Sequence, residues 1–378
     1  MKVAMSVSSL QELFAKFGTR LYQNESLDLD HYYQEPYQDN DGGEDDVYGM
    51  SSPFETDKVK KKRKLFYEAT GTSNFAFFMD GSRRTYKIGD LVMGNGKIYP
   101  VVVAQVRAGC GARDSERKIH KYLLEQKNLL LVSSVLNAYD FTELKMRIED
   151  SSQAKAMNLV VEQYKFDKMK DLAPTNAAIA KANSIMHEQE IYILKQMVNS
   201  SSLDTDRMLI VDGPLQFLKE DTGKADFADL FYNVVGVSKS FDPMLPISEK
   251  SKGGAQIGTQ LLSLEFGERT PVFYKQNSRG RRFGCWYLRI RPKSHVRSPL
   301  EGIIKVEKMA VREEYEDGFD SDIIDNLSRS LIEEGIPTCH GKDDRWAAHL
   351  YPVYLTETMV KSSFIGDLSF IHQFKKNF

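Results

Sequence analysis

Short hydrophobic runs and segments of helical periodicity alternate along most of the chain, which predicts a mixed α/β fold. The first run, residues 74–80, ends in Asp-Gly, and two more strand-like runs follow at 84–93 and 97–107. Asn95-Gly96, which separates those two, is a strong hairpin signal. We therefore expect the folded core to begin with three consecutive antiparallel strands.

The same criteria predict the elements that follow. The clearest helix spans residues 175–199. A second hairpin is expected from strands at 271–274 and 284–291, with Arg279-Gly280 in its turn. The other predicted elements are strands at 128–133, 159–164, 206–212 and 234–238, and helical segments at 321–334 and 353–374.

The first 65 residues differ from the rest and are expected to precede a single folded region of residues 66–378. Leu10, Leu13 and Phe14 recur at helical spacing and predict a short helix. Residues 24–48 hold nine acidic residues and no Lys or Arg, which is typical of a flexible acidic segment; a docking or DNA-mimicking strip is the alternative. The basic run 58–64 is compatible with a localisation signal, a nucleic-acid contact or a solvated face.

Composition adds few constraints. The 378 residues are 41% hydrophobic and 28% charged, with a net charge of −2, as in ordinary globular proteins. No apolar run reaches the roughly 18 residues that a membrane-spanning helix needs. The three cysteines are far apart and suggest no disulfide framework. We expect a cytoplasmic protein without a membrane segment.

Two hydrophobic strands each end in an aspartate followed by glycine, Asp80-Gly81 and Asp212-Gly213. A strand holds a carboxylate in place, and the glycine leaves room for a ligand. Neighbouring carboxylates repel one another unless a cation neutralises them, and Mg²⁺ or Mn²⁺ are the usual cations for such ligands. The alternative is that each Asp-Gly is an ordinary turn.

The helix at 175–199 supplies a third carboxylate. Glu190 lies within its apolar face, whereas Glu188 lies on the polar side. A carboxylate inside an apolar stripe is costly unless it is paired or bound to metal. Glu190 is therefore a candidate metal ligand, and the alternative is a glutamate that reaches solvent or pairs with a lysine.

The order of hairpin strands with an Asp, a helix with a Glu and a strand with a second Asp suits an RNase H-like mixed sheet with flanking helices. In its details the chain resembles the NurA nucleases, which are partners of the HerA translocase. The resemblance covers about residues 70–365 and is carried by residues 78–82, the Glu190 helix, 209–215, 235–239, 266–273 and 286–289. It implies two Mn²⁺ or Mg²⁺ ions held by Asp80, Glu190 and Asp212.

One part of the family pattern is altered. Where the family has a metal-associated histidine at the start of a C-terminal helix, the matching stretch 351–359 has Met359. His349 and Glu357 flank the motif and are the natural substitutes as catalytic residues. The departure leaves open whether the activity is retained.

Residues 269–297 contain nine Lys and Arg residues, no acidic residue and several aromatic side chains, which favours a DNA-binding surface. The alternative is a solvated hairpin whose aromatic residues belong to the core. The side chains predicted to contact DNA are Lys239, Arg279, Arg281, Arg282, Arg289 and Arg291.

The leading hypothesis is a metal-dependent deoxyribonuclease that degrades single strands or DNA ends. The resemblance implies a homodimer docked on a hexameric HerA-type ATPase, with a role in end resection or anti-phage defence. The alternative is a catalytically weakened DNA-binding or regulatory subunit of a translocase. Other phosphoryl-transfer or serine-hydrolase chemistry lacks support, because neither GxxxxGK[ST] nor G-x-S-x-G occurs.

Overall fold

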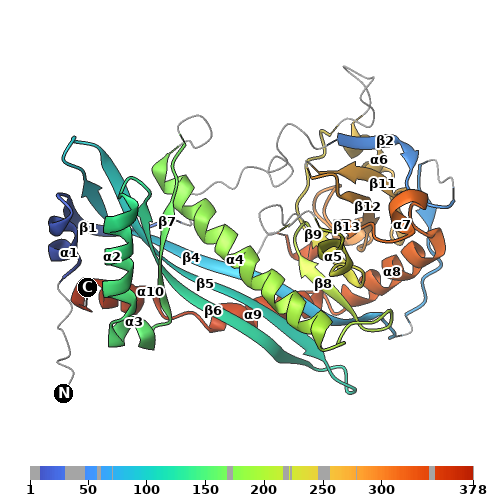
Figure 1. Ribbon diagram of the computed structural model, residues 1–378. Helices are drawn as coiled ribbons and strands as arrows, with labels where there is room; N and C mark the ends of the chain where they lie inside the picture. The colour runs from blue at the N-terminus through green and yellow to red at the C-terminus, as the bar shows by residue number, and fades with distance from the viewer. Residues whose placement is uncertain are drawn as a thin grey trace.

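One large mixed sheet with helices on both faces organises the molecule, as the sequence predicts at the level of an α/β fold (Figure 1). The computed structural model describes residues 9–29, 47–57, 61–69, 71–167, 173–215, 221, 224–245, 256–277, 279–339 and 345–377. Within these residues the sheet has 13 strands, ordered β2-β11-β12-β13-β9-β8-β4-β5-β6-β7 along its main path.

Three long antiparallel strands lie next to one another toward the β7 end of the sheet: β4 (Phe75–Val92), β5 (Ile98–Arg113) and β6 (Ile119–Ser133). The hairpin predicted at Asn95-Gly96 is confirmed, because Gly96 has a φ of +78° and joins β4 to β5. The predicted break after Asp80 is wrong. Gly81 pairs with Ala108 in the ladder, so the runs 74–80 and 84–93 belong to one strand. The run 128–133 is the end of β6.

Two parallel strands extend the sheet beyond β4. Helix α4 (Pro174–Asn199) crosses the long strands and leads to β8 (Met208–Asp212), which pairs parallel with β4 (Figure 1). β9 (Val234–Ser238) then pairs parallel with β8, and β7 (Leu159–Tyr164) pairs parallel with β6. These elements agree closely with the predicted ranges.

The remaining strands lie beyond β9 or at the start of the chain. The predicted second hairpin is confirmed by β11 (Phe273–Gln276) and β12 (Arg282–Arg289), and β13 (Ile303–Met309) joins β12 to β9. β10 (Glu268–Arg269) pairs with β12 and with β3 (Arg63–Lys64).

Part of the expected acidic flexible segment belongs to the sheet. β1 (Arg20–Asp28) pairs with β4, so the prediction is wrong for residues 24–28. β2 (Val47–Pro53) pairs with β11, which includes residues 47–48 of the segment. Residues 30–46 lie outside the described part of the chain. The predicted N-terminal helix is confirmed as α1 (Leu10–Lys16).

The helical segments predicted near the C-terminus are α8 (Ser321–Glu334), α9 (Tyr351–Ser362) and α10 (Asp367–Asn377). The expected single helix at 353–374 is thus divided in two. The Gln105 side chain on β5 accepts a hydrogen bond from the Ile365 N–H and donates one to the Ile365 carbonyl, which fixes a non-helical link between α9 and α10. The other described α-helices are α2 (Ala138–Glu149), α3 (Ser152–Ala156), α5 (Ala225–Asp229), α6 (Ile257–Leu262) and α7 (Glu314–Asp317).

The two faces of the parallel part of the sheet bury different side chains. Phe78 and Ile210 pack in one core with Trp286 and α8 residues such as Leu331. The neighbouring residues Met79 and Val211 pack on the other face with α4. This alternation decides which face each candidate carboxylate occupies.

Within the described residues, none of the helices has the length and hydropathy to span a bilayer.

Candidate functional site

Asp80 lies in the body of β4 on the face covered by α9. It pairs across the ladder with Gly109, and a Cβ placed on Gly109 would contact Val360 of α9. Only 7% of Asp80 is exposed, and its Oδ2 has no hydrogen-bond partner among the described residues. Burial raises the pKa of Asp80 well above its ordinary value, and repulsion from Asp212 raises it further. This carboxyl group therefore favours a proton or a cation.

Asp212 ends the neighbouring strand β8. The parallel register pairs Met79 with Val211, so Asp80 and Asp212 occupy adjacent positions. Here the predicted Asp-Gly turn is real: Gly213 has a φ of +114°, a conformation that side chains other than glycine rarely adopt, and the chain leaves the sheet. The two Asp-Gly pairs thus bring their carboxylates together by different local structures.

Lys239, which follows β9, lies between two carboxylates. Its Nζ is 2.7 Å from Asp212 Oδ2 and 3.7 Å from Glu357 Oε2, and its side chain is 10% exposed. Burial alone would lower the pKa of Lys239, but Asp212 and Glu357 outweigh it and hold the pKa above its ordinary value. The sequence predicts that Lys239 binds DNA; in the structure its ammonium group contacts Asp212 and Glu357.

Glu357 on α9 is the third carboxylate on this face. Burial tends to raise its pKa, but the charges of Lys239 and Lys361 outweigh burial and lower it. Its Oε2 is buried and accepts no hydrogen bond from a described residue. The side chains of Asp80, Asp212, Lys239 and Glu357 are hereafter called the acidic cluster.

His349 and Met359 take different places beside the acidic cluster. His349 is buried, contacts Tyr354 edge to face at 6.0 Å, and is close enough for its charge to lower the pKa of Glu357. Met359 lies two residues beyond Glu357 on α9, with its methyl group 3.4 Å from where a Cβ on Gly109 would lie. The methionine at the altered position therefore packs against β5, while Glu357 reaches Lys239.

Glu190 lies on the opposite face of β4. The helix phase inferred from sequence is confirmed, because Glu190 is 3% exposed whereas Glu188 is exposed. A Cβ on Gly81 would collide with Glu190 Oε1, so the missing side chain of Gly81 admits this carboxylate to the strand. Glu190 also raises the pKa of Asp80, but less than burial, Asp212 or Glu357 does.

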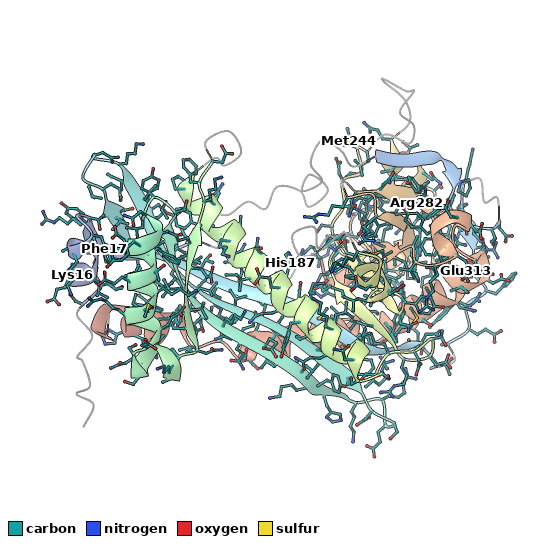
Figure 2. All side chains as sticks on the ribbon, in the orientation of Figure 1. Lys16, Phe17, His187, Met244, Arg282 and Glu313 are labelled. Carbon is teal, nitrogen blue, oxygen red and sulfur yellow. The ribbon has the colours of Figure 1, made fainter. Side chains whose placement is uncertain are left out.

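His187 is a neighbour of Glu190 that sequence patterns did not indicate. Its Nδ1 lies 2.7 Å from Glu190 Oε2, one helical turn away on α4 (Figure 2). An (i, i+3) pair of this kind is visible in the sequence once Glu190 is selected, because residues three apart are neighbours on a helix. The imidazole orients the carboxylate from its solvent side.

The donors suit a hard divalent cation, although they do not form a closed cage. Among the described residues, no three His, Cys, Asp or Glu side chains converge on one metal position. The three carboxylates of the acidic cluster nevertheless offer only oxygen donors. Two of these oxygens, Asp80 Oδ2 and Glu357 Oε2, are buried without a hydrogen bond from a described residue. Oxygen donors of this class are the ligands that Mg²⁺ and Mn²⁺ prefer. Lys239 supplies positive charge within the same cluster.

The arginines predicted to bind DNA are mostly committed to internal partners. Arg289 is fully buried and donates to the carbonyls of Glu301 and Pro299, and Arg291 is buried and donates to the Gly335 carbonyl. The prediction of a DNA contact is therefore wrong for Arg289 and Arg291, which cannot reach a phosphate from these positions.

Three arginines remain nearer the surface. Arg281 forms an ion pair with Asp221 at 2.9 Å, and the exposed Arg279 donates to the Asp221 carbonyl. Arg282 stacks on Tyr315, with its guanidinium carbon 4.2 Å from the ring centroid. The segment itself lacks acids, but Asp221 is supplied from elsewhere in the chain, so the local charge count overstated the positive surface.

The aromatic residues of β12 are also internal. Phe283, Trp286 and Tyr287 are buried, and the Trp286 indole donates to Ser328. They form core contacts, as the alternative interpretation of this hairpin held, and offer no face to an unpaired base.

In the basic run 58–64, Lys62 pairs with Glu268 at 2.6 Å and Arg63 with Asp325 at 2.6 Å, while residues 58–60 lie outside the described part.

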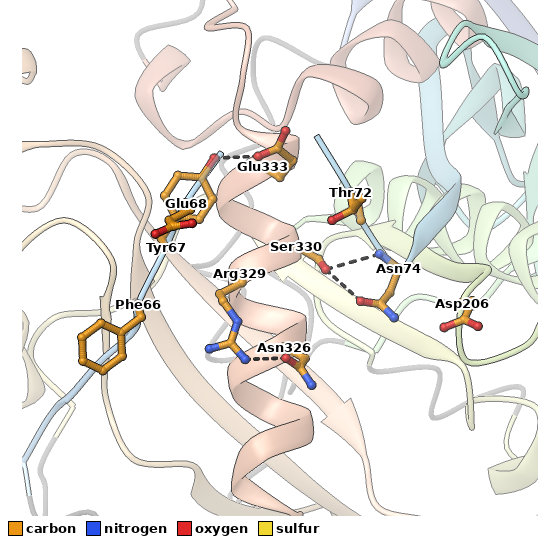
Figure 3. Close-up of a pocket in the computed structure, with 11 residues that line it drawn as sticks. Phe66, Tyr67, Glu68, Thr72, Asn74, Asp206, Asn326, Arg329, Ser330 and Glu333 are labelled. Atoms are coloured by element: carbon orange, nitrogen blue, oxygen red, sulfur yellow. Dashed lines mark hydrogen bonds between the residues drawn. The ribbon is translucent and has the colours of Figure 1, made fainter. Parts of the chain in front are cut away.

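A pocket of about 560 Å³ lies at the other end of the parallel strands (Figure 3). Asn74 and Asp206, which precede β4 and β8, line it together with α8 residues. Its polar groups largely satisfy one another: Tyr67 donates to Glu333 at 2.6 Å, and Ser330 to Asn74 at 2.9 Å. Asp212 ends β8 and Asp80 lies beside it on β4, whereas Asn74 and Asp206 precede these strands, so this pocket is separate from the acidic cluster.

Comparison with known proteins does not identify the chain: no family model matches it, and no curated protein gives a significant match. The function must therefore be argued from the acidic cluster and its surroundings.

Proposed function

We propose that the protein is a divalent-metal-dependent deoxyribonuclease whose active site is the acidic cluster with Glu190. The observation that carries the proposal is the electrostatic state of Asp80. Its Oδ2 is buried without a hydrogen-bond partner among the described residues, and burial and the neighbouring Asp212 raise the pKa of Asp80 despite the nearby Lys239, so this carboxyl favours a proton or a cation. Clustered buried carboxylates of this kind are characteristic of sites that bind divalent metal for phosphodiester hydrolysis.

The topology supports an RNase H-like sheet. Strands β4, β5 and β6 are antiparallel, α4 crosses the sheet, and β8 and β9 then add parallel to β4 on its other side. The first Asp comes from β4, the Glu from α4 and the second Asp from the end of β8, which is the order expected of such nucleases. This agreement supports the resemblance to NurA proteins as a hypothesis about fold.

The side chains of the proposed site have different roles in metal binding. A bound divalent ion would supply Lewis-acid activation of the phosphodiester and of the attacking water. Asp80, Asp212 and Glu357, which share one face of the sheet, would hold it. Glu190, oriented by His187 on the other face of β4, would add negative charge behind the site. Asp80 gives up any proton that it carries when a cation enters, because the added positive charge lowers its raised pKa.

Lys239 contributes without binding metal. Its ammonium group is held by Asp212 and Glu357 and offsets part of their mutual repulsion. As a positive charge beside the acidic cluster, it can also attract a DNA phosphate that approaches the site. In this way the proposed DNA contact of Lys239 and its observed ion pairs are compatible.

The assembly proposed from the resemblance is a homodimer that works with a hexameric HerA-type ATPase on DNA. A second candidate function is a DNA-binding or regulatory subunit of such a complex with little or no cleavage. It is favoured by Met359 at the altered position and by the lack of a closed metal cage among the described carboxylates. In both cases the acidic cluster is the feature under test.

Cleavage assays distinguish the two functions. We expect wild type to degrade linear DNA with Mn²⁺ or Mg²⁺ and to be inactive in chelator, and Asp80→Asn to lower the rate by at least about 100-fold. Asp206→Asn, an exposed aspartate just before β8, is the matched control and should retain wild-type activity. Activity unchanged in Asp80→Asn would refute the proposal. DNA binding without cleavage in wild type would favour the regulatory subunit.

A further inference from the structure

Arg107 is a buried cation on the same face of the sheet as the acidic cluster. It lies on β5 two residues before Gly109, on the face covered by α9, and is 2% exposed. Its guanidinium donates to the carbonyls of Val106 and Lys127 and to the side chains of Gln105 and Asn128. All four acceptors are neutral, so they satisfy hydrogen bonds without neutralising the charge.

Among the described residues, the charge of Arg107 has no acidic counterpart. Within the described part of the chain, Arg107 forms no ion pair, and its Nε is buried without a hydrogen-bond acceptor. Burial lowers the pKa of Arg107 to about 10, and no carboxylate opposes that effect. Buried charges are normally paired, because transfer of an unpaired ion from water is costly.

A polar pocket of about 500 Å³ opens beside this guanidinium. It lies where β5 and β6 meet α3 and the link between α9 and α10. Arg107 lines it together with five amides and a hydroxyl, all neutral: Gln126, Asn128, Gln153, Asn158, Gln373 and Ser363. None of the described lining residues is acidic. The pocket therefore combines a fixed positive charge with neutral hydrogen-bonding groups.

A second buried polar atom in this pocket lacks a partner. Gln373 Oε1, on α10, has no hydrogen-bond donor among the described residues. Since the two ends of a glutamine amide can exchange by a flip, Gln373 can present an NH₂ group there instead. Arg107 Nε and the Gln373 amide are thus two separate groups at one pocket that a ligand would satisfy.

We propose that the Arg107 pocket binds a phosphate monoester, either of a free mononucleotide or at the end of a DNA strand. A tetrahedral oxyanion matches the guanidinium and several amide donors, and charge-assisted hydrogen bonds of this type are strong. Inorganic phosphate would occupy a small part of the volume, so the remaining amides are available to a sugar or base. The depth of Arg107 favours a terminal phosphate over the diester backbone. The proposal does not depend on nuclease activity.

Substitution of Gln153 tests the proposal without removing the buried hydrogen bonds of Arg107. It is an exposed residue of α3 that lines the pocket, so a charge placed there changes the field at Arg107 without removing a core contact. Gln153→Glu would supply the missing anion, whereas Gln153→Lys would add a second cation. Arg107→Met is the direct variant, but the loss of its four hydrogen bonds can prevent folding.

The experiment is calorimetric titration of the full chain in chelator with deoxyadenosine monophosphate, inorganic phosphate and uncharged deoxyadenosine. We expect the monophosphate to bind more tightly than phosphate and deoxyadenosine not to bind. We also expect Gln153→Glu to weaken binding about ten-fold or more and Gln153→Lys to strengthen it. Equal binding of nucleoside and monophosphate, no binding of either, or an unchanged affinity in Gln153→Glu would overturn the proposal.

A further arm separates the two sources of the phosphate. Oligonucleotides with and without a 5′-phosphate are titrated under the same conditions. Tighter binding of the phosphorylated strand, lost in Gln153→Glu, supports a strand end as the ligand. Binding confined to the mononucleotide supports a free nucleotide.

Discussion

Replacement of Lys239 by methionine is expected to destabilise the protein strongly when no metal is present. The substitution keeps most of the side-chain volume and removes the charge from the acidic cluster. Asp80, Asp212 and Glu357 are then left on one face of the sheet without the ammonium group that separates them.

The magnitude follows from the ion-pair distances. At an effective dielectric constant of about 20, the 2.7 Å contact with Asp212 corresponds to about 6 kcal/mol of Coulomb attraction and the 3.7 Å contact with Glu357 to about 4 kcal/mol. The desolvation of Lys239, which the variant no longer incurs, offsets several kcal/mol of this. We therefore expect Lys239→Met to lower the free energy of unfolding by about 3–5 kcal/mol, the usual cost of breaking a buried pair.

Urea unfolding in chelator measures the effect. Lys118→Met is the matched control, because the Lys118–Glu116 pair is largely exposed and should contribute less than about 1 kcal/mol. The loss in Lys239→Met should shrink as pH falls, since Asp80 already has a raised pKa and, without the opposing charge of Lys239, binds a proton more readily in the folded state. A loss below about 1 kcal/mol, or one independent of pH, would show that Lys239 does not neutralise the cluster.

Three further predictions concern the same site. Asp80→Asn should increase the free energy of unfolding in chelator by about 1–2 kcal/mol at neutral pH. A carboxyl whose pKa is raised by folding destabilises the folded state when the pH exceeds its unfolded-state pKa, and the amide of the variant does not ionise. A decrease of the free energy of unfolding in urea titrations would contradict this. Gly81→Ala should cost about 1–3 kcal/mol and reduce Mn²⁺-dependent cleavage, because its Cβ collides with Glu190; wild-type stability and activity together would exclude the close approach. Glu357→Gln should reduce cleavage by at least about 100-fold while Met359→Leu stays near the wild-type rate, and equal rates for the two would remove Glu357 from the site.

Local patterns predicted the features that depend on local structure. The hairpin at Asn95-Gly96, the turn at Gly213 and the phase of Glu190 on its helix all follow from residues close in sequence. Each is fixed by backbone conformation or helical periodicity, which a short segment determines by itself.

Features that depend on distant partners were not accessible in the same way. Asp80-Gly81 has the composition of a turn, but the ladder with β5 keeps it extended. The sequence around Arg281 does not reveal its ion pair with Asp221, nor does the sequence around Lys239 reveal its pair with Asp212. Pairings of this kind arise from the tertiary fold, so charge counts along a segment do not reveal them.

Mn²⁺ titration of the wild type and of Asp80→Asn, by calorimetry in two buffers that differ in ionisation enthalpy, tests the central claim most directly. We predict that wild type binds Mn²⁺ with release of protons, because the ion displaces the proton that the raised pKa of Asp80 favours. Asp80→Asn should lose most of the affinity and the proton release, while Asp206→Asn should behave as wild type. Mn²⁺ binding of equal affinity in wild type and Asp80→Asn, or no Mn²⁺ binding by wild type, would contradict a metal site at the acidic cluster.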